Sequence, residues 1–310
     1  MNNPPHSFVV AFDVGGSHVT AGLCRLNDLA ILHTASSALA GDETFDSFAD
    51  LLFRLGCEAS LSEKAIAGAS LAVPFPFDCA AGISLMQHKF QSLYGKNLRT
   101  ALANRFGWKT DQLRFLNDAC AYLLGEIGAG SLKGAPRSAG LTLGTGIGSA
   151  FAVCGRCVTS GEGVPPEGEI WNLPFAGATV EDYISTRALK AEYKDRTGRD
   201  LEVSQIAAAV DTDADARGVF ENFGAHLGEV LHDIIAPFRP AMVMIGGGIS
   251  RSANLFLPFA EGHISGLGFS VVQSTLLDQA PLVGAAHFWR EDAKASEPAA
   301  AQPQALSTGR

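Results

Sequence analysis

Short apolar segments separated by turn residues run along the chain, and their periodicity predicts alternating strands and helices. Residues 8–26 alternate around a Gly-Gly pair, which predicts two strands joined by a tight turn, and residues 30–39 predict a third strand. Apolar residues at helical spacing predict a helix over 45–59. The continuous apolar run at 65–73 predicts a buried strand that ends at Pro74.

A second hairpin with a glycine-rich turn is predicted in the middle of the chain, at 139–158. The other predicted elements are strands at 113–116, 241–250 and 269–275 and helices at 97–106, 119–126, 179–194, 202–210, 213–236, 252–262 and 281–291. Because such a hairpin occurs twice, with further strands and helices after each, we predict two α/β domains of related design, with ligands between them.

The domain boundary is expected after residue 117. The chain has 310 residues, more than the roughly 250–300 at which a single core stops growing. Residues 1–117, with a C-terminal helix at about 281–293, are expected to form a small N-terminal domain, and 118–280 a larger C-terminal domain. Residues 294–310 are rich in Ala, Pro, Ser and Gln without periodicity, so we predict a disordered tail.

Composition narrows the classes of partner. The net charge is −9 and no cluster of Lys and Arg offers a surface for phosphates, which argues against nucleic acid. The N-terminal residues MNNPPHSFVVAF lack the pattern of a signal peptide, and no segment approaches the roughly 18 apolar residues of a membrane-spanning helix. We therefore expect a cytoplasmic protein with no membrane partner.

The six cysteines show no spacing typical of a disulfide framework. Cys154 and Cys157 form a CxxC motif, which is compatible with a redox pair or half of a zinc site. The alternative is a hairpin turn at Gly155-Arg156, because apolar residues flank it on both sides. No second Cys/His pair follows at zinc-site spacing, so we favour the turn.

Three glycine-rich turns each follow an apolar strand: 13–17 (DVGGS), 143–149 (LGTGIGS) and 246–250 (GGGIS). Consecutive backbone N–H groups in such turns can converge on phosphate oxygens, and the hydroxyls of Ser17 and Thr145 would add donors. The second turn fits a dinucleotide pattern, but strand-like residues follow it where that motif requires a helix. Any one turn is equally compatible with tight packing, whereas three together favour phosphate binding.

A polar pair ends the apolar run of 113–116. Asn117 and Asp118 stand where that strand gives way to a helix, in the stretch LRFLNDACAYLLGE. The carboxyl ends of strands are where ligands gather in open α/β sheets, so Asp118 is a candidate site residue. An N-cap for the following helix is the alternative role for Asp118, and geometry alone leaves both open.

The motifs DVGGS, LNDACAYLLGE, LTLGTGIGS, GEI, MIGGGIS and LVGAA occur in an order and at spacings that resemble the ROK family of sugar kinases, over about residues 8–290. That family belongs to the actin-like ATPase and hexokinase superfamily. The resemblance implies an α/β fold of two actin-like (ribonuclease H-like) domains with a ligand cleft between them. It also implies a glucokinase-like enzyme that phosphorylates a hydroxyl of a hexose or an N-acetylhexosamine with ATP.

The resemblance assigns roles to the turns and to the polar pair. The first two turns match the family's phosphate hairpins, and the third matches the turn beneath the nucleoside. The nucleotide-binding residues so implied are Asp13, Gly15, Gly16, Ser17, Gly144, Thr145, Gly146, Gly246, Gly247 and Gly248. Mg²⁺ is expected with ATP, near Asp13. Asp118 matches the catalytic general base and Asn117 a sugar-binding amide, which suits a vicinal diol.

The second sugar-binding segment departs from the family. The family has Glu-Ile-Gly-His there, and its Glu and His contact the sugar, whereas this chain has Glu169-Ile-Trp171-Asn172. Asn172 is expected to bind a hydroxyl, and Trp171 either packs against the sugar or belongs to the core. The Cys-rich zinc loop that normally follows is missing, so we expect no structural zinc. Glu181 matches the family's glutamate after that loop.

Two further positions concern the opposite wall of the expected pocket. Phe75 replaces the glycine of a Pro-Gly-Pro segment that is common in the family. Gly82, His88 and Gln91 lie on a loop that is expected to reach toward the sugar. The complete set of expected substrate-binding residues is Asn117, Asp118, Glu169, Asn172, Glu181 and Gly82.

Two alternatives to an ATP-dependent kinase follow from the resemblance. Some family members are sugar-sensing transcription regulators, but these carry a helix-turn-helix before the first hairpin, and only twelve residues precede Asp13. Polyphosphate-dependent glucokinases also lack the zinc loop, although a polyanion would favour a basic channel that this composition does not show. The expected ligands are ATP and a monosaccharide, and a homodimer is common in the family.

Overall fold

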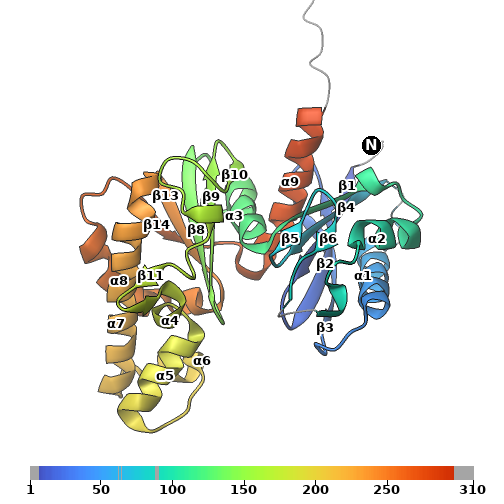
Figure 1. Ribbon diagram of the computed structural model, residues 1–310. Coiled ribbons are helices and arrows are strands. Elements are labelled where there is room, and N and C mark those ends of the chain that lie inside the picture. The colour runs from blue at the N-terminus through green and yellow to red at the C-terminus, as the bar shows by residue number, and fades with distance from the viewer. Residues whose placement is uncertain (1–6, 62, 64, 88–90, 297–310) are drawn as a thin grey trace, which may run out of the picture.

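The structure, a computed structural model, consists of two halves, each built on a five-stranded sheet, with two helices between them (Figure 1). It describes residues 7–296 apart from residues 62, 64 and 88–90. Within these residues, no helix has the length and apolar character needed to cross a membrane.

The first sheet has the strand order β3-β2-β1-β4-β7. Its strands are β1 (Phe8–Val14), β2 (His18–Arg25), β3 (Ile31–Ala38), β4 (Ile66–Val73) and β7 (Leu113–Asn117). The first three strands are antiparallel, whereas β4 and β7 extend the sheet in parallel from β1. Because β1, β4 and β7 are parallel, their carboxyl ends, which carry Asp13, Pro74 and Asn117, meet at one edge of the sheet.

The second sheet repeats this arrangement with the order β10-β9-β8-β13-β14. Its strands are β8 (Arg137–Leu143), β9 (Ile147–Val153), β10 (Arg156–Val158), β13 (Met242–Gly246) and β14 (Ser270–Gln273). Again the first three strands are antiparallel and the last two are parallel to β8. The expectation of two α/β domains of related design is therefore confirmed at the level of the fold.

Helices cover the sheets, and each half has apolar cores on both faces of its sheet. The first sheet packs against α1 (Phe45–Ser60) and α2 (Leu98–Phe106), with Phe12, Leu52 and Leu71 in its core. The helices of the second half are α4 (Val180–Tyr183), α5 (Thr186–Thr197), α6 (Val203–Ala209), α7 (Ala214–Val230) and α8 (Ala253–Ile264). Phe151 and Phe220 belong to the core of this half. Two small ribbons complete the strands: β5 (Phe77–Asp78) with β6 (Ile83–Ser84), and β11 (Pro174–Phe175) with β12 (Ala178–Thr179).

The two halves meet along α3 (Asp118–Ala129) and α9 (Ala280–Ser296), which lie side by side between the sheets (Figure 1). Glycines permit this close approach. A Cβ atom on Gly125 would lie 2.1 Å from the Ala280 carbonyl oxygen, and one on Gly284 would lie 1.7 Å from that of Ala121. Both glycines belong to motifs that the sequence singled out, and the packing of these helices explains them.

Glu126 stabilises the segment that connects β14 of the second sheet to α9. Its buried carboxylate accepts hydrogen bonds from the Ser131 and Leu276 N–H groups and from the hydroxyls of Ser131, Ser274 and Thr275. Burial alone would raise the pKa of Glu126, but the hydrogen bonds from Ser274, Ser131 and Leu276 lower it instead. The role of this carboxylate is therefore structural.

Several predicted elements differ from the observed ones. The helix expected over 179–194 breaks into α4 and α5, because Ser185 caps α5 by accepting the Ala188 N–H at 3.2 Å. The α-helix expected to reach residue 236 ends as α7 at Val230. A π-helical segment (Leu231–Ile235) and a 3₁₀ turn (Ala236–Phe238) follow it.

The last helix and the CxxC hairpin also differ in detail. Helix α9 continues to Ser296, so the first three residues of the expected disordered tail are helical, and 297–310 lie outside the described residues. The hairpin is present, but its turn is Cys154-Gly155, with φ of 50° and 75°, rather than Gly155-Arg156. This pair of positive φ angles is that of a two-residue type I′ turn. All six cysteines are free.

Candidate active site

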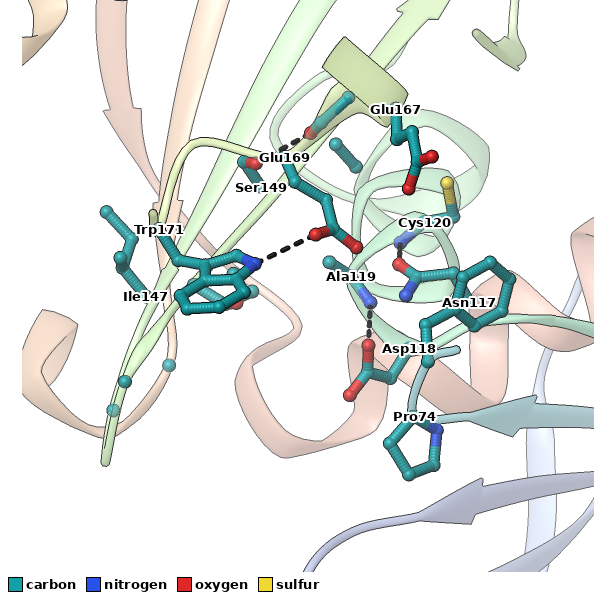
Figure 2. Close-up of a pocket in the computed structure, with 18 of the residues that line it drawn as sticks. Pro74, Asn117, Asp118, Ala119, Cys120, Ile147, Ser149, Glu167, Glu169 and Trp171 are labelled. Carbon is teal, nitrogen blue, oxygen red and sulfur yellow. Dashed lines mark hydrogen bonds between the residues drawn. The ribbon is translucent and has the colours of Figure 1, made fainter. Parts of the chain in front are cut away.

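A cavity of about 410 Å³ opens where the two halves face one another. The loop after β4 contributes Phe75, the junction of β7 and α3 contributes Asn117 and Asp118, and the β8–β9 turn contributes Gly144. Figure 2 shows that the side chains of the loop before α4, among them Glu169, face the N-terminus of α3. The cavity thus joins residues that are far apart in the sequence.

Asn117 and Asp118 occupy the end of β7 and the first turn of α3, respectively (Figure 2). The N-cap is Asn117, whose Oδ1 accepts the Cys120 N–H at 3.0 Å. The alternative role of Asp118 as the cap is therefore wrong, although its Oδ1 accepts the neighbouring Ala119 N–H at 2.8 Å. An amide whose Oδ1 is held in this way still directs its Nδ2 donor elsewhere, and a carboxylate at a helix N-terminus is stabilised as the anion.

Asp13, at the end of β1, lies near enough to Asp118 for their charges to interact. Burial, followed by the negative charge of Asp118, raises the pKa of Asp13 to about 6. Two carboxylates in this relation favour either a proton or a cation between them.

The β8–β9 turn is held in place by hydrogen bonds to Glu181 and Thr186. The Glu181 carboxylate accepts the Ile147 N–H at 3.3 Å, and it lies so close that a Cβ on Gly146 would be 2.1 Å from its Oε2. The Gly144 carbonyl accepts the Thr186 N–H at 2.8 Å. Gly144, Gly146 and Glu181 line the cavity, whereas Thr145 is exposed at the tip and does not.

The β1–β2 turn has a different environment. Gly15 donates its N–H to the His18 carbonyl at 2.9 Å, and nothing lies within 4 Å of the position of a Cβ on Gly16. Gly16 and Ser17 are exposed, and the three residues 15–17 do not line the cavity. Asp13 therefore interacts with the site through the charge of Asp118, although neither Asp13 nor the turn lines the cavity.

The third glycine-rich turn serves mainly to pack. A Cβ on Gly246 would meet the Tyr122 ring at 2.5 Å, and one on Gly247, whose φ is +80°, would meet the Leu143 carbonyl oxygen at 2.4 Å. Gly247 lines the cavity, whereas Gly248 is exposed with open space beside it. Gly246 and Gly247 are therefore required by packing against the β8–β9 hairpin and α3.

Glu167 and Glu169, from the loop before α4, line the cavity. The Glu169 Oε2 accepts the Trp171 indole N–H at 2.8 Å (Figure 2). Trp171 itself is 44% exposed and lines the cavity, so of its two expected roles the core role is wrong. The carbonyl of Trp171 accepts the Glu181 N–H at 3.0 Å, which connects this loop to the residue behind the β8–β9 turn.

Two expected sugar-binding residues lie elsewhere. Asn172 is exposed and does not line the cavity. Gly82 lies in a turn with a φ of +75°, where a Cβ would lie 2.4 Å from the Cβ of Arg99. Gln91, on the same loop as Gly82, begins a 3₁₀ turn outside the cavity, and His88 lies outside the described residues.

Sequence reasoning did not assign Glu167 to the site. Its side chain lines the cavity, and its φ of 58° is rare for a residue other than glycine. Residues held in such conformations concentrate at functional sites. The only signal in the sequence was a second glutamate two positions before Glu169, which by itself indicates nothing. In the described part of the chain, no group of three or more His, Cys, Asp or Glu side chains is arranged to hold a metal ion.

Comparison with known proteins is consistent with this architecture. The chain is 27% identical to a glucokinase of Thermotoga maritima, over 93% of this chain and 98% of the relative. It is 25% identical to an N-acetyl-D-glucosamine kinase of Escherichia coli, over 81% and 87% of the two chains. A ROK family glucokinase from Streptomyces griseus, solved with glucose and AMPPNP, superposes with a TM-score of 0.75 at 21% identity, over 91% and 98% of the chains.

The fold is therefore that of two actin-like domains with a cavity where they face one another, as the resemblance to the family implied. The family model described as ROK family matches residues 9–292, nearly the whole described chain. The protein belongs to the ROK family.

Proposed function

We propose that this ROK protein is a sugar kinase that transfers the γ-phosphoryl group of ATP to a hydroxyl of a hexose or an N-acetylhexosamine. The observation that supports this most is the position of Asp118, a carboxylate at the end of β7 that shares one cavity with the glycines of the β8–β9 turn. The names of the curated relatives, a glucokinase and an N-acetyl-D-glucosamine kinase, support the same reaction class.

Asp118 is proposed as the general base. A carboxylate there accepts the proton of the attacking sugar hydroxyl, while the transfer itself needs mainly positioning and charge neutralisation. Asn117 uses its Nδ2 to donate to a neighbouring hydroxyl, since its Oδ1 is held by Cys120. Glu169 accepts from another hydroxyl and is oriented by Trp171. These contacts hold the acceptor in line for attack.

Glu181 has a different proposed role from the one the resemblance implies. Its carboxylate is already engaged by Ile147 and lies 3.7 Å from the Arg187 guanidinium. We therefore assign Glu181 to holding the β8–β9 turn, whose N–H groups would receive the phosphates of the nucleotide. Asn172 and Gly82 are not assigned to the sugar site, because neither lines the cavity.

The site fits Mg²⁺ bound with ATP. Burial and the negative charge of Asp118 raise the pKa of Asp13, and a divalent cation beside Asp13 would relieve the repulsion from Asp118. When bound, Mg²⁺ neutralises charge on the phosphates. Asp13 would hold it, and Gly15, Gly16, Ser17 and Gly144 would receive phosphate oxygens through backbone N–H groups. No structural zinc is part of this proposal.

The open position of the β1–β2 turn supports closure of the two halves during catalysis. We place the boundary after residue 117, with α9 counted in the first domain. Closure would bring residues 15–17 onto the phosphates that the β8–β9 turn already faces. It would also exclude water from the γ-phosphate, as closing enzymes of this type require.

An assay of purified protein against a panel of hexoses and N-acetylhexosamines tests the proposal. ATP and inorganic polyphosphate are supplied in separate reactions, with Mg²⁺, and sugar phosphate is quantified directly. We expect ATP-dependent phosphorylation of at least one sugar. Phosphorylation by polyphosphate alone would overturn the assignment of the donor, and no phosphorylation of any sugar by either donor would overturn the assignment of the reaction.

A further inference from the structure

A second cavity, of about 310 Å³, lies beside the candidate active site. It is bounded by α3, by the β10 hairpin and by α9, so it sits where the two halves meet. Its inner wall is apolar and includes Leu116, Leu124, Cys157 and Phe288. Nothing in the proposed phosphoryl transfer uses this space.

The two cavities adjoin and share part of their lining. Phe75, Asn117, Cys120 and Thr159 line both of them. Asn117 is proposed to hold the acceptor sugar, so a substituent on a sugar bound there lies at the entrance of the second cavity. Phe75 is 40% exposed and lines both cavities. This chain therefore places an aromatic ring at the boundary between the two cavities.

Arg156 of β10 and His287, Glu291 and Asp292 of α9 line the second cavity beside its apolar residues. The side-chain interaction with Cys120, together with burial, raises the pKa of the Cys157 thiol well above its usual value, so the thiol is neutral. The charged side chains of α9 have partners within the protein. Asp292 pairs with Arg114 at 3.0 Å, and Arg290 contacts the Nδ1 of His287 at 3.0 Å.

We propose that the second cavity is a subsite of the acceptor site and binds an apolar substituent, an acyl or aryl group, carried by the sugar. The proposal rests on the proposed sugar kinase function and extends it from the sugar ring to what the ring carries. An apolar cavity of this size is poorly satisfied by water, whereas an apolar group gains from leaving water for it. Each methylene buried in this way improves binding roughly fourfold.

A substrate series tests the subsite. The value of kcat/KM is measured for glucose, phenyl β-D-glucoside, and N-acetyl-, N-butanoyl- and N-hexanoylglucosamine. We expect kcat/KM to rise at least tenfold either from the N-acetyl to the N-hexanoyl sugar or from glucose to the phenyl glucoside. A flat or falling trend in both comparisons would overturn the proposal.

A cavity-filling variant tests whether the rise in kcat/KM arises in the second cavity. Phe288→Trp places a larger ring in the second cavity, and Phe259→Trp, at an exposed position on α8, is the matched control. The gain should disappear in Phe288→Trp and persist in Phe259→Trp, with glucose turnover unchanged in both. A gain that survives in a folded Phe288→Trp would place the substituent elsewhere and overturn the proposal.

Calorimetry on the wild-type protein keeps the test independent of that variant. If the acyl chain is buried, the heat-capacity change of binding becomes more negative from N-acetyl- to N-hexanoylglucosamine. An unchanged heat capacity would contradict the subsite. Failure of the proposed function looks different, because neither glucose nor N-acetylglucosamine would then be phosphorylated, whereas the heat capacity would still report on the cavity.

Discussion

The two glycine-rich hairpins of this protein are alike in sequence and topology but differ in what surrounds them. Each joins the first two strands of a sheet with the same strand order. The β8–β9 turn is held by Glu181 and Thr186 and lines the cavity, whereas the β1–β2 turn has open space beside Gly16 and lies outside it. A topological repeat therefore does not imply equivalent environments.

The difference indicates that the two hairpins have different roles in the site. The β8–β9 turn is fixed by its own half of the molecule, through the same segment that carries Glu169 and Trp171. The β1–β2 turn contributes Asp13 at its base, and burial together with the charge of Asp118 raises the pKa of Asp13. In our proposal the first hairpin completes its contacts only when nucleotide is bound and the halves close.

Asp118 lies between the two hairpins, and its substitution should have the largest effect. In Asp118→Asn the side chain keeps its size but cannot accept the proton, so kcat should fall by about 10²–10⁴-fold. Steady-state kinetics measures this, with thermal unfolding as the control for an intact fold. Activity within a few-fold of the wild type would remove Asp118 from the proposed role.

Valine substitutions at the two turns compare the hairpins directly. At Gly16 no atom lies within 4 Å of the position that a Cβ would take, and at Gly144 only the Gly146 carbonyl oxygen does, at 4.0 Å. Both Gly16→Val and Gly144→Val should therefore fold normally but weaken the binding of AMPPNP by about tenfold or more, because the added bulk occupies the place of the phosphates. Calorimetric titration checks this.

If either valine variant binds the nucleotide as tightly as the wild type, that turn does not contact phosphate. A loss confined to Gly144→Val would restrict nucleotide binding to the second hairpin. Gly146→Val is not a suitable probe, because its side chain would collide with Glu181 and disturb the turn itself.

The raised pKa of Asp13 predicts how nucleotide binding depends on pH. Because the folded pKa is about 6, lowering the pH from 7.5 to 5 protonates Asp13, and the affinity for Mg²⁺–AMPPNP should fall about tenfold. Asp13→Asn should bind weakly with little pH dependence over that range. Equal pH profiles for the two proteins would argue against a metal-facing role.

The same shift has a consequence for stability with the opposite sign. A carboxyl group whose pKa is raised on folding binds its proton more tightly in the folded state. In the ligand-free protein, the contribution of Asp13 to the free energy of unfolding therefore increases as the pH falls from above 6 to 3.8, which is the ordinary pKa of an aspartate.

The smallest effect is expected at Trp171. Trp171→Phe retains an aromatic ring but removes the indole N–H that Glu169 accepts, a bond worth roughly 0.5–1.5 kcal/mol. We expect the KM for sugar to rise by about twofold to tenfold, with little change in kcat and in the affinity for nucleotide. A matched loss of nucleotide affinity would show that this bond also supports the β8–β9 turn.

Local patterns in the sequence determined much of this protein. The periodicity predicted both hairpins and most helices, because alternation and helical spacing report which face of an element is buried. The apolar run that ends in Asn117 and Asp118 predicted a strand-to-helix junction with polar groups at the sheet edge, since the strand and the cap are both local features. The glycines of three turns were recognisable for the same reason.

Contacts between distant segments were decided only by the tertiary structure. Glu181 meets Ile147 across 34 positions, and Gly284 packs on Ala121 through a helix crossing that no local pattern encodes. Glu167, whose φ is 58°, lines the cavity, whereas Asn172, five residues later, remains outside. The direction of a loop side chain depends on the packing of the whole chain, and for that reason the sequence indicated some of the residues that line the cavity but not all of them.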